Sequence, residues 1–340
     1  MSRRDMPTLA LLRTQALRLL VTGLTGKVGM SFLPAFRADE RFAGWHVRAI
    51  CHNRVVDDPD VEIVRASIAD AEAVREAMDG VTHVLHLASV KETPDLAMDV
   101  GVKGMFNLLE AFRQSDDARQ FMLISGDCTV GHIMQPYEEP ITEASPRRPY
   151  PGSYALTKAL EEAMLENCRL QYGINTCCLR APWIMEKDDF RHALSFRAQF
   201  GGPPWSALLR QDEIARYAEL DAVPLLRDVT GAPLRRNFIH VSDLVTAILA
   251  ALDNPAAEGH LFNISMNAPV DYAETTAHLA ATRGIPVVEI ATPFHSNWLD
   301  NAKARFLLGW RPLVDFIELV ERAWTYQRAP DDPRIVWYPG

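Results

Sequence analysis

The sequence predicts an α/β protein in which a doubly wound parallel sheet is followed by a smaller α/β C-terminal domain. Short apolar runs alternate with helix-like segments through the first 185 residues, and then charged residues, Pro, Gly and Trp interrupt this rhythm. Repeated strand–helix–strand units favour a parallel sheet with helices on both faces. With 340 residues, 48% of them hydrophobic, the chain is long enough to bury a substantial core. Such a sheet binds ligand at the carboxyl ends of its strands, where the winding reverses.

Hydrophobic periodicity places the individual elements. Short apolar runs predict strands at 17–22, 46–51, 61–64, 81–88, 121–125, 238–241 and 261–264. Apolar residues at helical spacing predict helices after Gly29 and at 71–78, 100–112 and 242–252. Ser242 stands at the start of the last segment and is expected to cap that helix.

Composition excludes several classes of function. The formal net charge is −9 with both signs interspersed, so no general surface for nucleic acid or anionic membranes is expected. No apolar run approaches the roughly 20 residues that span a bilayer. The ten histidines are scattered, and the five cysteines are odd in number without a Cys-x-x-Cys pair, so neither a metal site nor a disulfide framework is expected. Cysteine usage and the absence of a secretory pattern predict a cytoplasmic protein.

The segment VTGLTGKVG at 21–29 has glycines at every third position between an expected strand and helix. Gly23 suits a tight turn, Gly26 a close approach of the backbone to a pyrophosphate, and Gly29 close packing of helix on strand. The helix N-terminus then offers free N–H groups to the phosphates. The turn therefore predicts a Rossmann-type dinucleotide site, with further contacts from Thr25, Lys27 and Val28.

The residues after the second strand indicate which dinucleotide is bound. An acidic residue about 20 positions after the glycines would bind the ribose 2′-hydroxyl of NAD. The strand ends instead in Cys51, followed by His52, Asn53 and Arg54. Arg54 and His52 suit a 2′-phosphate, which favours NADP over NAD. The other interpretation of Arg54 is a solvated loop residue.

Tyr154 and Lys158 are four residues apart in the helical stretch SYALTKALEEAML. This spacing places both side chains on one face of a helix. A tyrosine hydroxyl normally titrates near 10, and a neighbouring ammonium lowers its pKa. Tyr154 can then exchange a proton with a carbinol or carbonyl while hydride moves to or from nicotinamide. Lys158 is also expected to bind the nicotinamide ribose.

Several motifs in the same order resemble the extended short-chain dehydrogenase/reductase family, also called the NAD-dependent epimerase/dehydratase family. The resemblance begins near residue 17 and covers nearly all of the remaining chain. The matching segments are the glycine turn, His86-Leu87-Ala88, Asn107-Leu108-Leu109-Glu110-Ala111 with Gly104, Tyr154-x-x-x-Lys158, Leu179-Arg180-Ala181-Pro182-Trp183-Ile184, Arg236-x-Phe238-Ile239-His240-Val241-x-Asp243, and Gly309-Trp310-x-Pro312.

The resemblance implies a cofactor domain, a substrate domain, a cleft between them and a homodimer formed through helices that include the Tyr-x-x-x-Lys helix. We expect residues 17–185, with 236–264 returning, to bind the cofactor, and residues 186–235 and 265–340 to bind substrate. Residues 1–16 form an N-terminal extension without a visible purpose. Further cofactor contacts are expected from Ser67, Ile68, Leu87, Ala88, Ser89, Pro182 and Ile184.

The chain departs from the family after the fifth strand, where a catalytic hydroxyl is usual. Aligned without gaps, that position is Gly126, and Ser125 or Thr129 would supply the hydroxyl if the loop shifts. Ser125 is the expected catalytic residue, with a strand-end structural hydroxyl as the alternative. Cys128 stands where sugar dehydratases and decarboxylases carry Glu, which argues against both reactions. Gly101 replaces a common Asn.

The predicted reaction is hydride transfer at a secondary alcohol or ketone of a sugar, sugar acid or similar small polar molecule. Arg236 suits a carboxylate or phosphate of the substrate, while Asp127, Trp183 and Gln199 are expected to line its pocket. The sequence does not distinguish a net dehydrogenase from an epimerase. A non-catalytic, NADP-sensing regulatory protein on the same fold is the alternative, because the hydroxyl is missing at Gly126.

Overall fold

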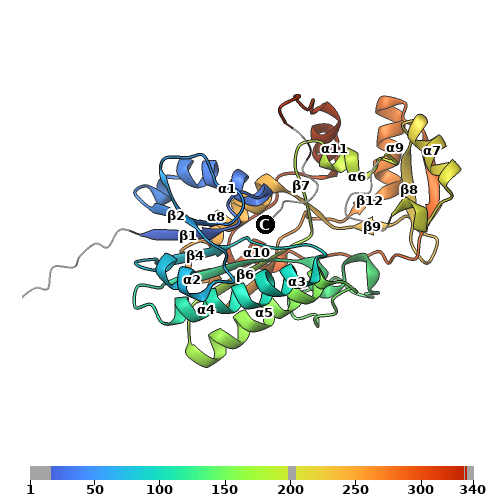
Figure 1. Ribbon diagram of the computed structural model, residues 1–340. Helices are drawn as coiled ribbons and strands as arrows, with labels where there is room; N and C mark the ends of the chain where they lie inside the picture. The colour runs from blue at the N-terminus through green and yellow to red at the C-terminus, as the bar shows by residue number, and fades with distance from the viewer. Residues whose placement is uncertain (1–16, 198–203, 333, 335–340) are drawn as a thin grey trace, which may run out of the picture.

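The computed structural model describes residues 17–197, 204–332 and 334. A seven-stranded parallel sheet forms the first lobe, which confirms the predicted fold class (Figure 1). Its order is β11-β6-β5-β4-β1-β2-β3, and the winding reverses between β1 and β4. The strands are β1 (Arg18–Thr22), β2 (His46–Cys51), β3 (Val61–Arg65), β4 (His83–His86), β5 (Gln120–Gly126), β6 (Thr176–Ala181) and β11 (His260–Asn263).

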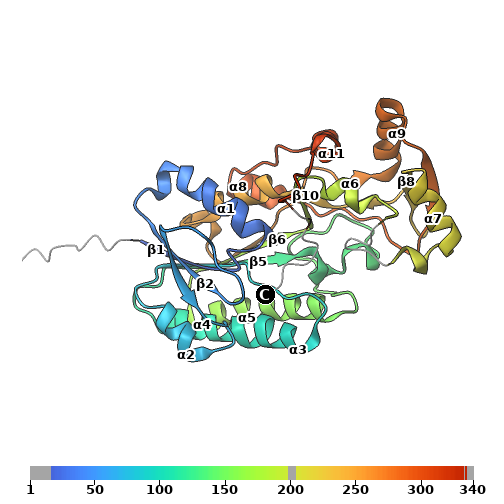
Figure 2. The ribbon, with the colours of Figure 1, turned by 45° about the horizontal axis from the view of Figure 1, so that its top comes forward.

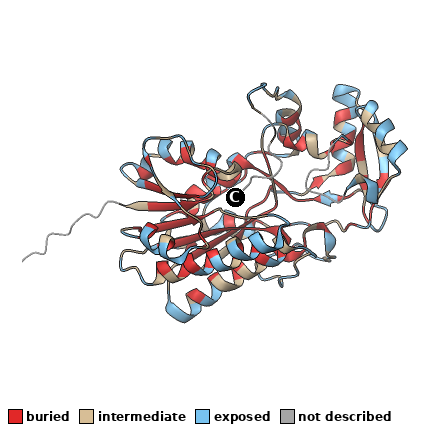
Figure 3. Ribbon diagram, in the orientation of Figure 1, coloured by how far each residue is buried: buried red, intermediate tan, exposed pale blue. Residues whose placement is uncertain are grey.

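Helices cover both faces of this sheet, and its central strands are buried, whereas the edge strands β3 and β11 are partly exposed (Figure 3). One face carries α1 (Lys27–Ala38) and α8 (Val241–Ala251), whose apolar residues share one core cluster. The other face carries α2 (Ala71–Ala77), α4 (Met105–Arg113) and α5 (Ser153–Tyr172), with a second cluster beneath them. The short helices α3 (Pro94–Ala97), η1 (Glu40–Phe42), η3 (Asp127–Val130), η4 (His132–Met134) and η6 (Pro255–Ala257) lie in connections.

Three local expectations are corrected by backbone hydrogen bonding. Helix α1 begins at Lys27, so Gly29 lies inside it rather than before it. The N-cap of α8 is His240, whose Nδ1 accepts from the backbone N of Ser242 at 3.2 Å, so Ser242 is not the cap. The helix expected at 100–112 is divided between a π-helical turn, η2 (Met98–Gly104), and α4.

The second lobe is built from three two-stranded sheets and short helices, which lie away from the large sheet in two views (Figures 1 and 2). Its strands are β7 (Trp183–Met185) with β10 (Phe238–His240), β8 (Val223–Arg227) with β13 (Val287–Ala291), and β9 (Arg235–Arg236) with β12 (Val270–Asp271). Its helices are α6 (Asp189–Ala193), η5 (Trp205–Ala207), α7 (Gln211–Glu219), α9 (Tyr272–Arg283) and α11 (Phe316–Thr325).

The C-terminal part of the chain crosses back to the first lobe, although residues 265–340 were expected in the substrate domain. Ala304 of α10 (Ala302–Leu307) and Trp310 belong to the core cluster under α1 and α8. The indole of Trp310 donates to the carbonyl O of Asp243 at 3.1 Å, while the Asp243 carboxylate accepts from the backbone N of Val314 at 2.9 Å. None of the helices in the described segments is long and apolar enough to span a bilayer.

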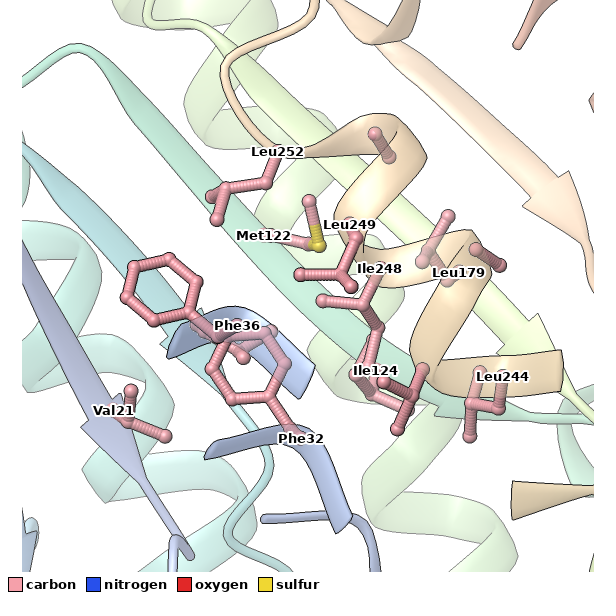
Figure 4. Packing of buried hydrophobic residues seen from close by; sticks show 14 of the residues in the cluster. Val21, Phe32, Phe36, Met122, Ile124, Leu179, Leu244, Ile248, Leu249 and Leu252 are labelled. Atoms are coloured by element: carbon pink, nitrogen blue, oxygen red, sulfur yellow. The ribbon is translucent and has the colours of Figure 1, made fainter. Parts of the chain in front are cut away.

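The core between α1, α8 and the sheet is dominated by aromatic and branched side chains (Figure 4). Phe32 and Phe36 of α1 are 0% and 2% exposed, with ring centroids 5.3 Å apart. They approach Ile248 and Leu249 of α8 over β5. This packing holds α1, and with it the glycine turn, against the sheet.

We predict that Phe36→Ala lowers the free energy of unfolding by about 3–5 kcal/mol, because it leaves a cavity in a fully packed cluster. Phe306→Ala is the matched control, since that side chain is 86% exposed, and its effect is expected to stay within about 0.5 kcal/mol. Urea unfolding followed by circular dichroism measures both. Equal losses for the two variants would contradict this account of the core.

Candidate active site

The glycine turn between β1 and α1 is packed too closely for side chains at two of its glycines. Gly23 has a φ of +73°, and a Cβ there would lie 2.6 Å from the backbone N of Ala88. A Cβ at Gly29 would lie 2.3 Å from the carbonyl O of Leu24. Gly26 caps α1 without a side chain, so the first N–H groups of the helix face outward for an anion. The turn therefore fits the pyrophosphate of a dinucleotide.

The other predicted contacts of the turn point in different directions. Lys27 reaches the second lobe, where its Nζ lies 2.5 Å from Oδ2 of Asp189 and 3.1 Å from the carbonyl O of Ile184. Val28 packs against the first-lobe core, and Thr25 is half-buried. The ion pair of Lys27 joins α1 to α6 of the second lobe, while direct cofactor contacts of these side chains stay a prediction.

The end of β2 carries the residues predicted to meet the adenosine ribose. His52 and Asn53 are exposed there, and Arg54 is half-buried. The carboxylate of Asp58 lies in the same loop, but Arg37 of α1 binds it with an N–O distance of 2.5 Å. The Asp58 carboxylate is therefore compensated by Arg37.

Ser67 and Ile68, at the end of β3, differ in their surroundings. The Ser67 hydroxyl accepts from the backbone N of Ala69 at 3.2 Å, which shapes the turn. Ile68 is only 5% exposed, and a Cβ at Gly104 would lie 2.5 Å from its Cγ1. Its side chain therefore packs on the start of α4, and contacts of this segment with an adenine base stay a prediction.

The end of β4 is locked to β1 beside the glycine turn. The backbone N of Leu87 donates to the carbonyl O of Thr22 at 3.1 Å. The backbone N of Ala88 donates to the hydroxyl Oγ1 of Thr22 at 3.2 Å. The same hydroxyl lies 2.6 Å from Nδ1 of His86. These bonds bring Leu87, Ala88 and the half-buried Ser89 to the place where the winding reverses.

Helix α5 presents Tyr154 and Lys158 to the end of β5. Lys158 is 3% exposed, and its Nζ donates to the carbonyl O of Ile124 at 3.1 Å and to Oε2 of Glu161 at 2.7 Å. The hydroxyl of Tyr154 lies 3.6 Å from the point that a Cβ at Gly126 would occupy. The predicted Tyr–Lys pair thus meets the loop where the family carries its hydroxyl.

Two charged residues that the sequence reasoning missed come from the loop after β4. The Nζ of Lys91 lies 3.4 Å from the ring centroid of Tyr154, close enough for a cation–π contact. Glu92 accepts from the backbone N of Ser153 at 2.9 Å and so holds the first turn of α5. Part of the Lys91 side chain is exposed to solvent, but desolvation by the surrounding protein lowers its pKa to about 8.

The surroundings of Tyr154 favour its neutral phenol. Burial raises the pKa of Tyr154 well above 10, and coulombic interactions with the neighbouring acidic groups, among them Glu161 and Asp127, add to the rise. The carboxylate of Glu161 meanwhile opposes the charge of Lys158. The proposed lowering of the Tyr154 pKa by Lys158 stays a prediction.

The end of β5 and the following η3 carry two hydroxyls and one thiol near the position of the missing hydroxyl. Ser125 donates to Oε1 of Glu162 at 2.7 Å, and Thr129 lies 3.1 Å from the same oxygen. A Cβ at Gly126 would instead lie 3.1 Å from Sγ of Cys128. The thiol of Cys128 therefore occupies the space beside Tyr154, whereas both hydroxyls are bound to a structural carboxylate.

A chain of polar contacts runs from this loop to the second lobe. Asp127 Oδ2 lies 2.6 Å from Nδ1 of His132, and Nε2 of His132 lies 2.6 Å from Nη2 of Arg236. Because Arg236 is always a donor, His132 accepts at Nε2 and donates from Nδ1 to Asp127. The guanidinium of Arg236 stacks on Trp183 at 3.9 Å. Three of the four predicted substrate residues are thereby joined through His132.

The remaining predicted contacts are placed less directly. Pro182 is buried between β6 and β7, and Ile184 of β7 accepts from Lys27 through its carbonyl. Gln199 lies outside the described residues. In the part of the chain that the structure describes, no cluster of His, Cys, Asp and Glu is arranged to hold a metal ion.

Known proteins share this architecture and its sequence pattern. The NAD dependent epimerase/dehydratase family matches residues 19–189. A short-chain dehydrogenase/reductase superfamily protein from Agrobacterium tumefaciens with bound NAD aligns with a TM-score of 0.74 and 27% identity, covering 91% of this chain and 96% of that one.

Two relatives of stated activity resemble the sequence as well. UDP-glucose 4-epimerase of Mycolicibacterium smegmatis is 26% identical over 333 residues, 92% of this chain and 99% of its own. Uronate dehydrogenase of Pseudomonas syringae pv. tomato is 29% identical over 165 residues, 48% and 58% of the two chains. The chain therefore belongs to the NAD dependent epimerase/dehydratase family and is an enzyme of the extended short-chain dehydrogenase/reductase type.

Proposed function

We propose that this enzyme moves hydride between a nicotinamide cofactor and a secondary alcohol or ketone of a sugar, sugar acid or related small polar molecule. The observation that carries the proposal is the meeting of Tyr154, Lys158 and the end of β5 beside the glycine turn. The cofactor supplies or accepts the hydride when bound. A uronate dehydrogenase and a UDP-glucose 4-epimerase among the relatives support a sugar substrate.

Tyr154 is the proposed acid and base. As a phenol it donates its proton to a carbonyl oxygen that becomes an alcohol, and as a phenolate it takes that proton back in the reverse direction. Lys158 favours the phenolate and binds the nicotinamide ribose. For the polarising group we retain Ser125, released from Glu162 by a shift of the loop. The thiol of Cys128 is the second candidate, because it already lies beside the space opened by Gly126.

An anionic group of the substrate is proposed to reach Arg236. This guanidinium is 5% exposed and held flat on Trp183, so a carboxylate or phosphate would meet a preorganised donor. Asp127 and Trp183 would border the same space, and Gln199 is retained as a predicted contact.

Epimerase and dehydrogenase differ in one respect: the epimerase returns its cofactor oxidised after each turnover.

Replacement of Tyr154 by Phe is expected to reduce turnover by about 10²- to 10⁴-fold, the usual contribution of a general acid–base group. Nicotinamide absorbance with uronates and neutral aldoses measures dehydrogenation, and chromatography of UDP-glucose products measures epimerisation. Tyr172→Phe is the control, because Tyr172 ends the same helix and is 52% exposed.

The cofactor-binding strength of Tyr154→Phe separates a chemical defect from a binding defect. Unchanged turnover in Tyr154→Phe would overturn the proposed mechanism. Cofactor binding by the wild-type protein without any conversion would favour the NADP-sensing alternative instead.

We further propose NADP as the preferred cofactor, on the strength of Arg54 and His52 at the end of β2. Bound NAD in the related Agrobacterium protein supports NAD as the other possibility.

If Arg54 binds a 2′-phosphate, Arg54→Ala raises KM for NADP by about tenfold or more, since a charge-assisted bond contributes roughly 1.5–3 kcal/mol. KM for NAD then changes little. Arg37→Ala is the control, because its guanidinium is already bound to Asp58. Parallel increases for both cofactors would contradict NADP preference.

A cytoplasmic homodimer is the proposed form of the enzyme. All five cysteines are free and buried, which suits a reducing compartment. Large apolar side chains are exposed along the face of α3, η2, α4 and α5, namely Leu96, Met98, Phe106, Leu156 and Leu170. Such a patch is typical of a protein interface, and a second copy presenting the same face would cover it.

Phe106→Asp is expected to convert the dimer to a monomer, because a carboxylate would be desolvated at the centre of the patch. Light scattering after size exclusion measures the mass. Phe306→Asp on α10 serves as the control at an exposed site outside this face. A wild-type monomer, or a dimer unaffected by Phe106→Asp, would refute this interface.

A further inference from the structure

Helix α5, which carries Tyr154 and Lys158, also contains a buried ion pair between Lys158 and Glu161. The Nζ of Lys158 is 2.7 Å from Oε2 of Glu161, and the two side chains are 3% and 1% exposed. The second hydrogen bond of Lys158 goes to the carbonyl O of Ile124 at the end of β5. Glu161 thus contacts the one side chain whose charge the proposed chemistry requires next to Tyr154.

Gly101 provides the space for this carboxylate. A Cβ at Gly101 would lie 2.8 Å from Cβ of Thr157, which would have to shift, and 3.1 Å from Oε1 of Glu161, which is a tight contact. Gly101 sits in the π-helical turn η2, which packs on α5. The sequence departs here from the common Asn, and the carboxylate of Glu161 and the side chain of Thr157 lie next to the glycine.

The neighbouring carboxylate shows what a purely structural acid looks like in this helix. Glu162 is 1% exposed, and Arg180 binds both of its oxygens, at 3.1 and 2.7 Å. Arg147 and the hydroxyls of Ser125 and Thr129 also bind this carboxylate. Glu162 therefore has guanidinium partners outside the active site, whereas Glu161 is paired with Lys158.

We propose that Glu161 is a positioning residue of the active site, which fixes the ammonium of Lys158 and offsets its charge beside Tyr154. The inference rests on the proposed function of Tyr154 and Lys158. It assigns to Glu161 a contribution to the stability of the Tyr154 phenol, in addition to that of burial, which is the larger cause. In the resting enzyme the Tyr154 hydroxyl is then a proton donor rather than a proton acceptor.

Several other titratable groups lie around Tyr154 and Glu161. Tyr154 is faced by Lys91 from the loop after β4, by Asp127 and Cys128 of η3, and by Tyr150 from the loop before α5. His86 of β4 is neutral next to Lys158, because burial lowers its pKa to about 3. The charged residues of the helices packed on α5 are at least partly exposed: Asp95, Asp99, Lys103, Glu110 and Arg113.

The sign of the effect follows from these contacts. The negative charge of Glu161 is one of the groups that raise the pKa of Tyr154. Removing that charge leaves Lys158 unopposed, so the phenolate forms at lower pH. Substrate oxidation, which needs the phenolate, should therefore begin at lower pH in the variant, while reduction should lose activity at lower pH.

The test is a titration of Tyr154 in the folded full-length protein, with tyrosine labelled at Cζ and followed by NMR. Comparison with Tyr154→Phe assigns the signal. Glu161→Gln is expected to move the midpoint of Tyr154 downward by about one pH unit, and the alkaline rise of kcat/KM for oxidation by the same amount. Glu166→Gln is the control, because Glu166 lies on the same helix but is half exposed and bound to Arg147.

Glu161→Asp provides a second measurement if the amide variant folds poorly. It keeps the charge but withdraws the carboxylate from Lys158 by one methylene, so a smaller shift in the same direction is expected. An unchanged Tyr154 midpoint in a folded Glu161 variant would overturn the inference. The titration needs no turnover, so a failure of the proposed function, seen as full activity in Tyr154→Phe, is recognised separately.

Discussion

The buried carboxylate of Glu162 is the contact on which the geometry of the site depends. It receives hydrogen bonds from Arg180 of β6 and Ser125 of β5 while belonging to α5. A buried charge without partners would cost several kcal/mol, so these elements are held together by the need to compensate it. Because Tyr154 and Lys158 lie on the same helix, their distance from the end of β5 is determined by this contact.

Polar contacts join the two lobes at two places. Lys27 of the glycine turn pairs with Asp189 of α6, and Asp127 is connected through His132 to Arg236 of β9. Both links join a residue near the proposed cofactor or catalytic loop to the second lobe. A change in the position of the second lobe would therefore be felt at the glycine turn and at the loop after β5.

Two unusual glycines alter the chemistry of the site in related ways. At Gly126 the thiol of Cys128 lies 3.1 Å from the point that a Cβ would occupy, and at Gly101 the carboxylate of Glu161 lies at the same distance from such a point. In each case a reactive or charged group borders the space left by the missing side chain. The site thus keeps its Tyr–Lys pair while changing the groups that surround it.

Periodicity and the glycine spacing were sufficient to determine the parallel sheet, the turn at Gly23 and the position of Tyr154 and Lys158 on one helix, because these are local patterns. His132, Lys91 and Glu161 gave no local signal. Their contacts join segments far apart in the chain, or depend on which face of α5 meets η2. Only the tertiary structure decided that Ser125 is turned toward Glu162, that Ile68 is turned into the core, and that Glu161 opposes Lys158, since packing and charge compensation between distant segments set those orientations.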